Sequence, residues 1–213
     1  MYKAVVFDFD YTLGDTTNGI VASANYALKT LGHEERSVDE IKRTIGLSLK
    51  DTFAALTDIR DGEQSERFAA LFREKADEVM TDSAALYDRV TEILPKLHKK
   101  HKIGIVTTKF HYRIEAILKK FGVSEFVDVI VGGEDVIREK PDPEGLLKAI
   151  DALGADKNEA LYVGDSLVDA RTAANAGVGF AAVLTGITSD FSQYDSVFIG
   201  KSVSEVYDFV IKE

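Results

Sequence analysis

The chain has 213 residues, 45% of them hydrophobic and 29% charged, which is enough to bury the core of one large domain or of a main domain with a smaller one. The formal net charge of -10 argues against a protein that binds the backbone of nucleic acids, because that affinity depends on basic residues. There are no cysteines, so disulfides and thiolate metal sites are excluded. No apolar run approaches the length of a membrane span, and the first apolar run carries acids, unlike a signal peptide. We therefore expect a cytoplasmic protein with neither a membrane nor a nucleic acid as partner.

The first element is a short apolar strand, and a turn over 14–17 follows it, where Thr16 or Thr17 can cap the next helix. From there to about residue 83 the pattern is helical, with no strand-like alternation. It predicts a helix that ends at Gly32, a short helix that begins at the capping box of Ser37 and Glu40 and ends at Gly46, and helices over 48–56 and 63–81.

From about residue 87 helices alternate with short, almost continuously apolar strands. The helices are expected around 90–97 and over 111–120, 143–153 and 168–176, with a last one from 202, and the strands over 103–106, 127–131, 160–163, 180–184 and 197–199. This alternation indicates a parallel sheet covered on both faces. The predicted fold is therefore a doubly wound, Rossmann-like α/β core formed by residues 1–14 and 85–213. An all-helical insert, residues 15–84, interrupts it after the first strand.

Two carboxylates follow the first strand. Asp8 and Asp10 are spaced i and i+2, so in extended backbone they lie on one face. Two such charges about 4 Å apart repel each other by about 4 kcal/mol at an effective dielectric constant near 20. Mg²⁺, which prefers oxygen ligands, would remove that repulsion. For this stretch alone, a role as turn formers is an equally good interpretation.

Polar side chains also follow the other strands of the expected core. Thr107 follows the strand over 103–106, and Asp165, Ser166 and Asp169 follow the strand over 160–163, while Lys140 precedes the helix over 143–153. Sites in open parallel sheets form at the carboxyl ends of the strands. Phosphoryl transfer through an aspartyl phosphate requires such a set: a carboxylate nucleophile, a second carboxyl group as acid and base, a metal ion, a lysine and a hydroxyl group.

Four motifs stand in the order that is typical of one enzyme family. They read Asp8-Phe9-Asp10-Tyr11-Thr12, then Thr107, then Lys140-Pro141, then Gly164-Asp165-Ser166-Leu167-Val168-Asp169. In these residues the chain resembles the haloacid dehalogenase-like hydrolases over nearly its whole length. The insert resembles the small α-helical cap of one subclass, and we expect it to exclude water during the reaction and to open for product release.

The resemblance implies a role for each matched position. Asp8 would be the nucleophile and a Mg²⁺ ligand, and Asp10 the general acid and base that also ligates Mg²⁺ through its backbone carbonyl. Asp165 would be the third protein ligand. Asp169 would also belong to the metal site, where it would support the waters of the metal or Lys140. Phosphate binding would fall to Thr107, Thr108 and Lys140. The alternative interpretations are a solvated lysine for Lys140, a strand-end hydroxyl that satisfies a backbone group for Thr107, and a helix-dipole partner for Asp169.

Within the family, the stretches Val106–Lys109 and Lys140–Pro143 look most like phosphoglycolate phosphatases and related pyrophosphatases. The beta-phosphoglucomutases fit less well. Tyr11 stands where the subclass usually has glycine and Gly14 where it usually has an aliphatic residue, which leaves the substrate in doubt. Side chains that would grip the rest of the substrate are Thr16, Arg43, Lys50 and Lys109.

The expected function is a Mg²⁺-dependent phosphatase acting on a small phosphorylated metabolite. A pyrophosphatase and a sugar-phosphate mutase are alternatives with the same chemistry, and a regulatory module phosphorylated on Asp8 is an alternative of another class. The sequence leaves open whether the protein is a monomer or a dimer. His33, His98, His101 and His111 have no metal-ligand spacing, so no role is assigned to them.

Overall fold

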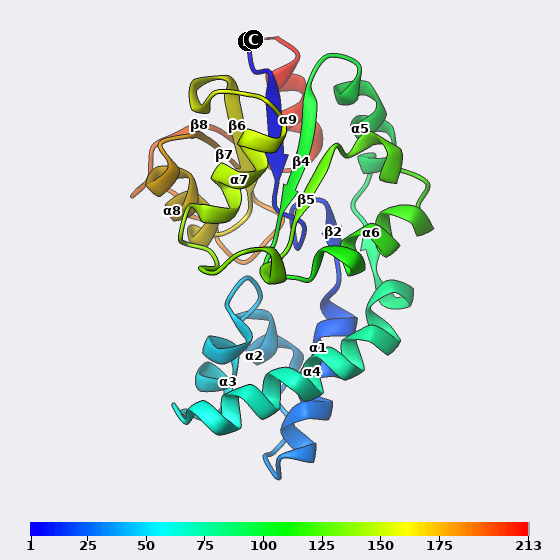
Figure 1. Ribbon diagram of the computed structural model, residues 1–213, viewed down its shortest axis with the longest axis vertical. Helices are drawn as coiled ribbons and strands as arrows, with labels where there is room; N and C mark the ends of the chain where they lie inside the picture. Colours follow the sequence, from blue (N-terminus) through cyan, green and yellow to red (C-terminus); the bar gives the residue numbers. More distant parts are fainter. Residues whose placement is uncertain (213) are drawn as a thin grey trace. The chain divides into compact units, whose positions relative to one another are not determined.

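The computed structural model describes residues 1–212 of the chain (Figure 1). It separates into two compact units. One consists of Met1–Asp15 together with the chain from Leu86 onward, and the other is Thr16–Ala85. These divisions lie one residue from the domain boundaries that the sequence predicts, while the role of the helical unit as a cap stays a prediction.

The first unit is built on a six-stranded sheet in the order β5-β4-β1-β6-β7-β8, with every neighbouring pair parallel. Its strands are β1 (Ala4–Phe7), β4 (Lys102–Val106), β5 (Val129–Val131), β6 (Ala160–Gly164), β7 (Gly179–Val183) and β8 (Ser196–Gly200). The predicted doubly wound α/β fold is confirmed. A two-stranded sheet of β2 (Gly14–Asp15) and β3 (Ala85–Leu86) was not predicted, because two residues are too few to show a period.

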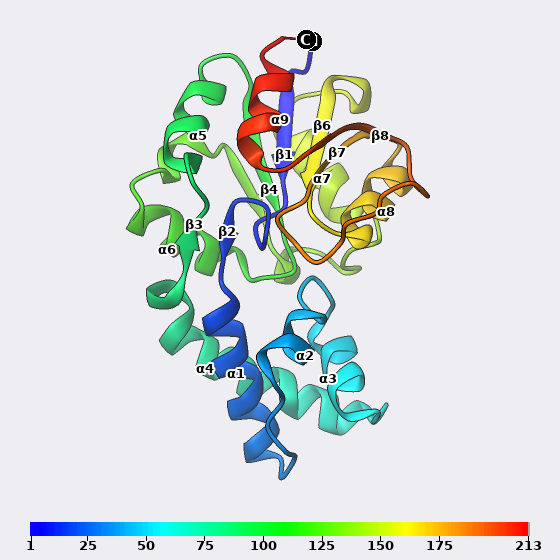
Figure 2. The same ribbon diagram turned by 180° about the vertical axis from the view of Figure 1, so that it is seen from behind.

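Helices cover both faces of this sheet. They are α5 (Val90–His98), α6 (His111–Lys120), α7 (Glu144–Ala152), α8 (Leu167–Ala176) and α9 (Val203–Val210), with short 3₁₀ turns η1 (Ser124–Phe126), η2 (Gly133–Asp135) and η3 (Lys157–Glu159). The helices α7 and α8 lie in front of the sheet in Figure 1, and α9 lies in front of it in Figure 2. Ala4 and Val6 of β1 pack in the core beneath α7 and α8 together with Tyr162 and Phe180. All four residues of β1 are completely buried, as expected for the central strand of a covered parallel sheet.

The second unit consists of four helices, α1 (Thr17–Thr30), α2 (Val38–Lys42), α3 (Leu49–Thr57) and α4 (Gly62–Ser83). Its core includes Phe53, Phe68 and Phe72, whose successive ring centroids are 5.3 and 6.1 Å apart. Gly19 of α1 approaches α4 so closely that a Cβ there would lie 2.8 Å from the sulfur of Met80. The helical character predicted for this stretch is therefore correct.

Three details of these helices differ from or refine the expectations. The capping box of Ser37 and Glu40 is present, and Thr16 is the N-cap residue of α1, although its side chain makes no capping hydrogen bond. The prediction that α2 runs to Gly46 is wrong, because the helix ends at Lys42. Beyond it the chain forms turns with i to i−3 bonds, such as the Thr44 N–H to the carbonyl of Ile41, which do not continue an α-helix.

Candidate active site

The loop after β1 carries the first two carboxylates. The N–H of Asp8 still donates to the carbonyl of Val163 in β6, at 2.8 Å. Beyond it the carbonyl of Phe9 accepts the N–H groups of three later residues, Thr12, Leu13 and Gly14, at 2.9–3.2 Å. The loop that contains Asp10 is therefore tight.

Tyr11 holds a left-handed conformation in this loop, with φ of 57°. Glycine takes this conformation without strain, whereas a residue with a Cβ loses about 1 kcal/mol or more. The Tyr11 carbonyl accepts the hydroxyl of Thr185, and its N–H donates to the carbonyl of Gly14 at 2.8 Å. Backbone contacts on both sides of Tyr11 therefore hold the residue in this conformation.

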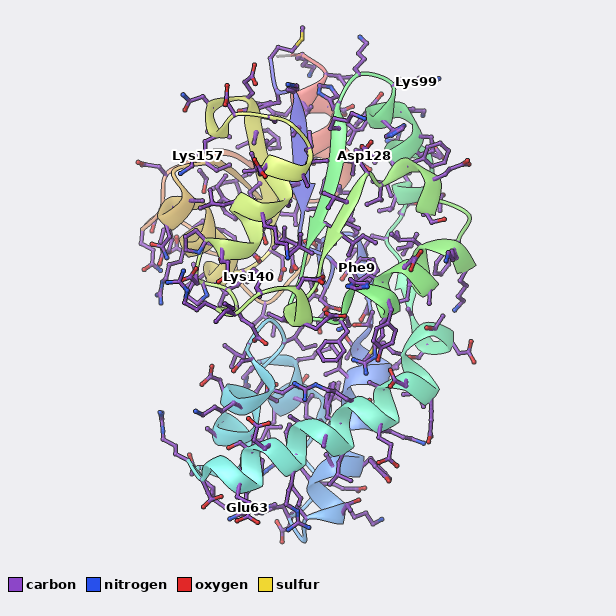
Figure 3. The ribbon with its side chains drawn as sticks, in the orientation of Figure 1. Phe9, Glu63, Lys99, Asp128, Lys140 and Lys157 are labelled. Carbon is purple, nitrogen blue, oxygen red and sulfur yellow. The ribbon has the colours of Figure 1, made fainter. Side chains whose placement is uncertain are left out.

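Lys140 lies among the carboxylates at the same end of the sheet as Phe9 (Figure 3). Its amino group donates to Asp8 Oδ1 at 2.8 Å and to Asp169 Oδ1 at 2.7 Å. The side chain is 5% exposed, so the alternative of a solvated lysine is wrong. Burial lowers the pKa of Lys140, but the Asp169 and Asp8 carboxylates more than offset this and raise it well above its usual value. The peptide bond between Lys140 and Pro141 is cis.

Asp169 is fully occupied by hydrogen-bond donors. Its Oδ1 accepts Lys140 and, at 2.9 Å, the hydroxyl of Tyr162. Its Oδ2 accepts the N–H of Ser166 at 3.2 Å and also the Ser166 hydroxyl. Because Asp169 and Ser166 also form the capping box of α8, this carboxylate both begins a helix and holds Lys140.

Asp165 completes the acidic group. Its carboxylate and those of Asp8 and Asp169 each place an oxygen within 4.8 Å of the others, and all three residues are buried. A Cβ on Gly186 would lie 1.8 Å from Asp165 Oδ2, so only glycine fits beside this carboxylate. Thr12 donates to Asp165 Oδ1 at 3.5 Å, a long hydrogen bond.

The electrostatics of the group favour a cation. Burial raises the pKa of Asp8 to about 7, with Lys140 opposing the rise and the neighbouring carboxylates of Asp169 and Asp10 adding to it. Burial, followed by the charges of Asp169 and Asp8, raises the pKa of Asp165 well above its usual value. Buried, crowded carboxylates whose pKa values are raised in this way suit a divalent ion with oxygen ligands. The residues present thus fit a hard cation held by Asp8 and Asp165.

Asp165→Asn is expected to stabilise the metal-free protein at alkaline pH. An acid whose pKa is raised by folding stabilises the fold fully below its unfolded pKa, and this contribution is lost as pH rises through the folded pKa. The neutral amide escapes that loss, so we expect a Tm above that of the wild type by more than about 2 °C at pH 8, with little difference near pH 4. Mg²⁺ should raise the Tm of the wild type and not that of the variant.

Thermal unfolding with and without Mg²⁺ measures both effects, with the exposed Asp208→Asn of α9 as the matched control. A variant less stable than the wild type at pH 8 would contradict the assigned charge crowding.

Thr107 and Lys109 come from the end of β4. The N–H of Thr107 donates to the carbonyl of Val131 at 3.1 Å, and its hydroxyl oxygen accepts the N–H of Lys109 at 3.2 Å. The amino group of Lys109 lies 2.7 Å from Asp10 Oδ2. Each of the first two carboxylates therefore has its own lysine, Lys140 for Asp8 and Lys109 for Asp10. Thr108 lines a pocket beside this end of the sheet, together with Thr107, Lys140 and backbone of Gly132 and Gly133.

Thr16, Arg43 and Lys50 belong to the helical unit. Thr16 is buried at the start of α1, while Arg43 and Lys50 are exposed. Their expected contact with substrate stays a prediction.

Two features of the first unit have no signal in the sequence. Tyr162, in the middle of β6, reads as an apolar strand residue, yet its hydroxyl reaches Asp169. His111 Nδ1 lies 2.9 Å from Asp135 Oδ2 and 3.4 Å from Glu134 Oε1, and the hydrogen bond to Asp135 raises the pKa of His111. The two partners of His111 are more than 20 positions away along the chain, so no spacing motif reveals them.

Tyr162→Phe tests whether the phenol supports Lys140 through Asp169. Burial raises the pKa of Tyr162 well above its usual value, so the hydroxyl remains a neutral donor. Its loss should destabilise the protein by about 1.5–3 kcal/mol, the range for a hydrogen bond to a charged group. Urea unfolding measures this effect, and Tyr207→Phe in α9 is the control. Equal stability of the two variants would show that the phenol contributes nothing to holding Asp169.

A family model for haloacid dehalogenase-like hydrolases matches residues 5–183. The chain belongs to this family, and the expected membership and the assignment as an enzyme, a hydrolase, are confirmed. Among relatives, it is 35% identical over 211 residues to the pyrophosphatase PpaX of Halalkalibacterium halodurans, covering 98% of this chain and 96% of that one. It is 33% identical over 206 residues to pyrophosphatase PpaX of Bacillus velezensis, covering 95% and 94%.

Solved structures agree with this assignment. A haloacid dehalogenase-like hydrolase from Bacteroides fragilis superposes with a TM-score of 0.93 at 42% identity, covering 97% of this chain and all of that one. A predicted phosphoglycolate phosphatase from Haemophilus somnus superposes with a TM-score of 0.87 over 98% of both chains, and at 22% identity it is similar in fold alone. Among residues 1–212, no helix is both long and apolar enough to cross a membrane.

Proposed function

We propose that the protein is a Mg²⁺-dependent phosphatase that hydrolyses a small phosphorylated metabolite through an aspartyl phosphate on Asp8. The observation that carries the proposal is the buried cluster at the carboxyl end of the sheet. There the amino group of Lys140 donates a hydrogen bond to Asp8, and that of Lys109 donates one to Asp10, two residues later. A nucleophile, an acid and base, and two cations thus stand together where substrates bind in open parallel sheets.

In the proposed first step, a carboxylate oxygen of Asp8 attacks phosphorus and the bond from phosphorus to the leaving oxygen breaks. The carboxyl group of Asp10 donates a proton to that oxygen. In the second step Asp10 takes a proton from a water molecule that attacks the phosphorus of the aspartyl phosphate. Orthophosphate leaves, and Asp8 returns as a free carboxylate.

The transferred phosphoryl group needs donors to its oxygens. Lys140 is charged and lies against Asp8, so it is placed to bind a phosphoryl oxygen. The hydroxyl oxygen of Thr107 already accepts the N–H of Lys109, which leaves its proton to be donated to the substrate. Thr108, on the same pocket wall, is the third proposed donor.

We propose that Asp8 and Asp165 hold Mg²⁺ through their carboxylates and Asp10 through its backbone carbonyl. When bound, Mg²⁺ neutralises the charge that keeps carboxylate and phosphate apart. For Asp169, which sequence analysis also places among the metal ligands, the four donors on its two oxygens favour the other expected role. It holds Lys140 in position rather than ligating the ion directly.

The names of the relatives suggest which substrate the enzyme hydrolyses. Relatives at 33% and 35% identity carry the name pyrophosphatase, so hydrolysis of pyrophosphate is a second candidate beside that of a phosphoglycolate-like ester. We also propose that residues 15–84 act as the cap that excludes water, and that the protein works in the cytoplasm as a monomer or dimer.

The test is a panel of phosphoglycolate, pyrophosphate, hexose phosphates and an aryl phosphate, with Mg²⁺ and with EDTA. We expect turnover that requires Mg²⁺ and releases orthophosphate. Absence of turnover on the whole panel, with a single stoichiometric phosphorylation of Asp8, would instead indicate a regulatory module. Conversion of one hexose phosphate to its isomer would indicate a mutase.

A further inference from the structure

Lys109 is a buried cation with a fixed backbone. Its side chain is 10% exposed, and its amino group lies 2.7 Å from Asp10 Oδ2, on a side chain that is 8% exposed. Its N–H donates to Thr107, and its carbonyl faces Gly132, where a Cβ would approach to 2.7 Å. A lysine held in this way is not an ordinary surface charge.

The proposed role of Asp10 as the general acid locates Lys109 relative to a substrate. The inference about Lys109 therefore rests on the proposed function. The oxygen that leaves phosphorus must come within hydrogen-bond distance of Asp10 to receive its proton. Lys109 Nζ is one hydrogen bond beyond the same carboxyl group, so it lies within about 8 Å of the leaving oxygen, the sum of two hydrogen bonds and the distance between the two carboxyl oxygens. Lys140, in contrast, contacts Asp8 and serves the transferred phosphoryl group.

Within residues 1–212, the ammonium group of Lys109 has more N–H donors than hydrogen-bond partners. A lysine carries three N–H donors, and the hydrogen bond to Asp10 Oδ2 uses one. An anionic oxygen that is a few bonds away from the leaving oxygen would reach the remaining donors and be partly desolvated there. Charge-assisted hydrogen bonds of this kind are about twice as strong as neutral ones.

We infer that Lys109 binds a second anionic group on the leaving part of the substrate. The enzyme therefore favours phosphate compounds whose leaving group is itself an anion, such as a phosphorylated 2-hydroxy acid or pyrophosphate. Phosphate esters of sugars, alcohols and phenols lack this second anion and gain nothing from Lys109.

The experiment compares kcat/KM on matched substrates. Phosphoglycolate and pyrophosphate have anionic leaving groups, while 2-hydroxyethyl phosphate and an aryl phosphate have leaving groups without a carboxylate or phosphate. For Lys109→Met, the ratio of kcat/KM between anionic and neutral substrates should fall on the order of tenfold or more. Lys109→Arg should recover much of the ratio. Lys119→Met, which removes a 63% exposed charge from the same unit, should leave it unchanged.

A ratio within one preparation does not depend on how much of the protein is folded, so a partly unfolded variant still gives an answer. Equal losses on all four substrates would overturn the inference, since Lys109 would then serve only to orient Asp10. An unchanged ratio, or a wild-type preference for the neutral leaving groups, would overturn it too. Absence of Mg²⁺-dependent turnover by the wild type on every substrate would instead overturn the proposed function itself.

Discussion

Asp8→Asn is expected to abolish phosphatase activity, lowering kcat/KM by about 10⁴-fold or more on every substrate. The amide has nearly the shape of the carboxylate, yet it cannot attack phosphorus, and it leaves Lys140 with Asp169 as its remaining carboxylate partner. Incubating the wild type with labelled substrate, followed by rapid denaturation, should trap a labelled protein. The variant should give none.

The control for this variant is Asp208→Asn, which removes an exposed carboxylate of α9. Since burial raises the pKa of Asp8 to about 7, the neutral side chain should not lower the Tm of the metal-free protein at pH 8. A well-folded Asp8→Asn protein with substantial activity would show that another residue is the nucleophile.

Asp10→Asn is expected to lower kcat by about 10²–10⁴-fold, the range for loss of a general acid and base. The loss should be larger for alkyl phosphates than for nitrophenyl phosphate, because nitrophenolate leaves without a proton. The second step also needs Asp10, so phosphorylated protein should accumulate with the nitrophenyl substrate. A burst of nitrophenolate followed by slow turnover measures this.

The comparison between substrates separates the chemistry from a structural effect. Asp10→Asn also breaks the buried contact with Lys109, and a displaced lysine would slow all substrates. Lys109→Met provides the complementary control, because it removes the same contact and keeps the acid. If Asp10→Asn slowed nitrophenyl and alkyl phosphates equally and gave no burst, Asp10 would not be the acid and base.

Much of the architecture follows from short-range pattern. The helix α6 occupies the predicted range of 111–120, because an amphipathic repeat of ten residues followed closely by Gly122 predicts both the helix and its end. Polar residues that end strands also converge as predicted, because parallel strands share one carboxyl edge. The end of α2 was missed, since Gly46 stops a series of turns whose helix had already ended at Lys42.

Other contacts of the polar groups at the site were not predicted from the sequence. Lys109 is a candidate for binding substrate from its motif, but its contact with Asp10, 99 positions away, arises because β4 lies beside β1 in the sheet. The same holds for Tyr162. A tyrosine in an apolar strand is interpreted as a core residue, and only the structure shows that its hydroxyl contacts the buried carboxylate of Asp169. The need for glycine at 186 depends on the side chain of Asp165, on a different strand end.

The central position of β1 has a consequence for synthesis of the chain. β1 is translated before both of its neighbours in the sheet, because Ala4 pairs with Lys102 on one side and Ala160 on the other. The helical unit is contiguous in sequence, and contacts between near positions form early. We therefore expect the helical unit to fold during translation before Asp8 has its contact with Lys140, which lies in the second half of the polypeptide.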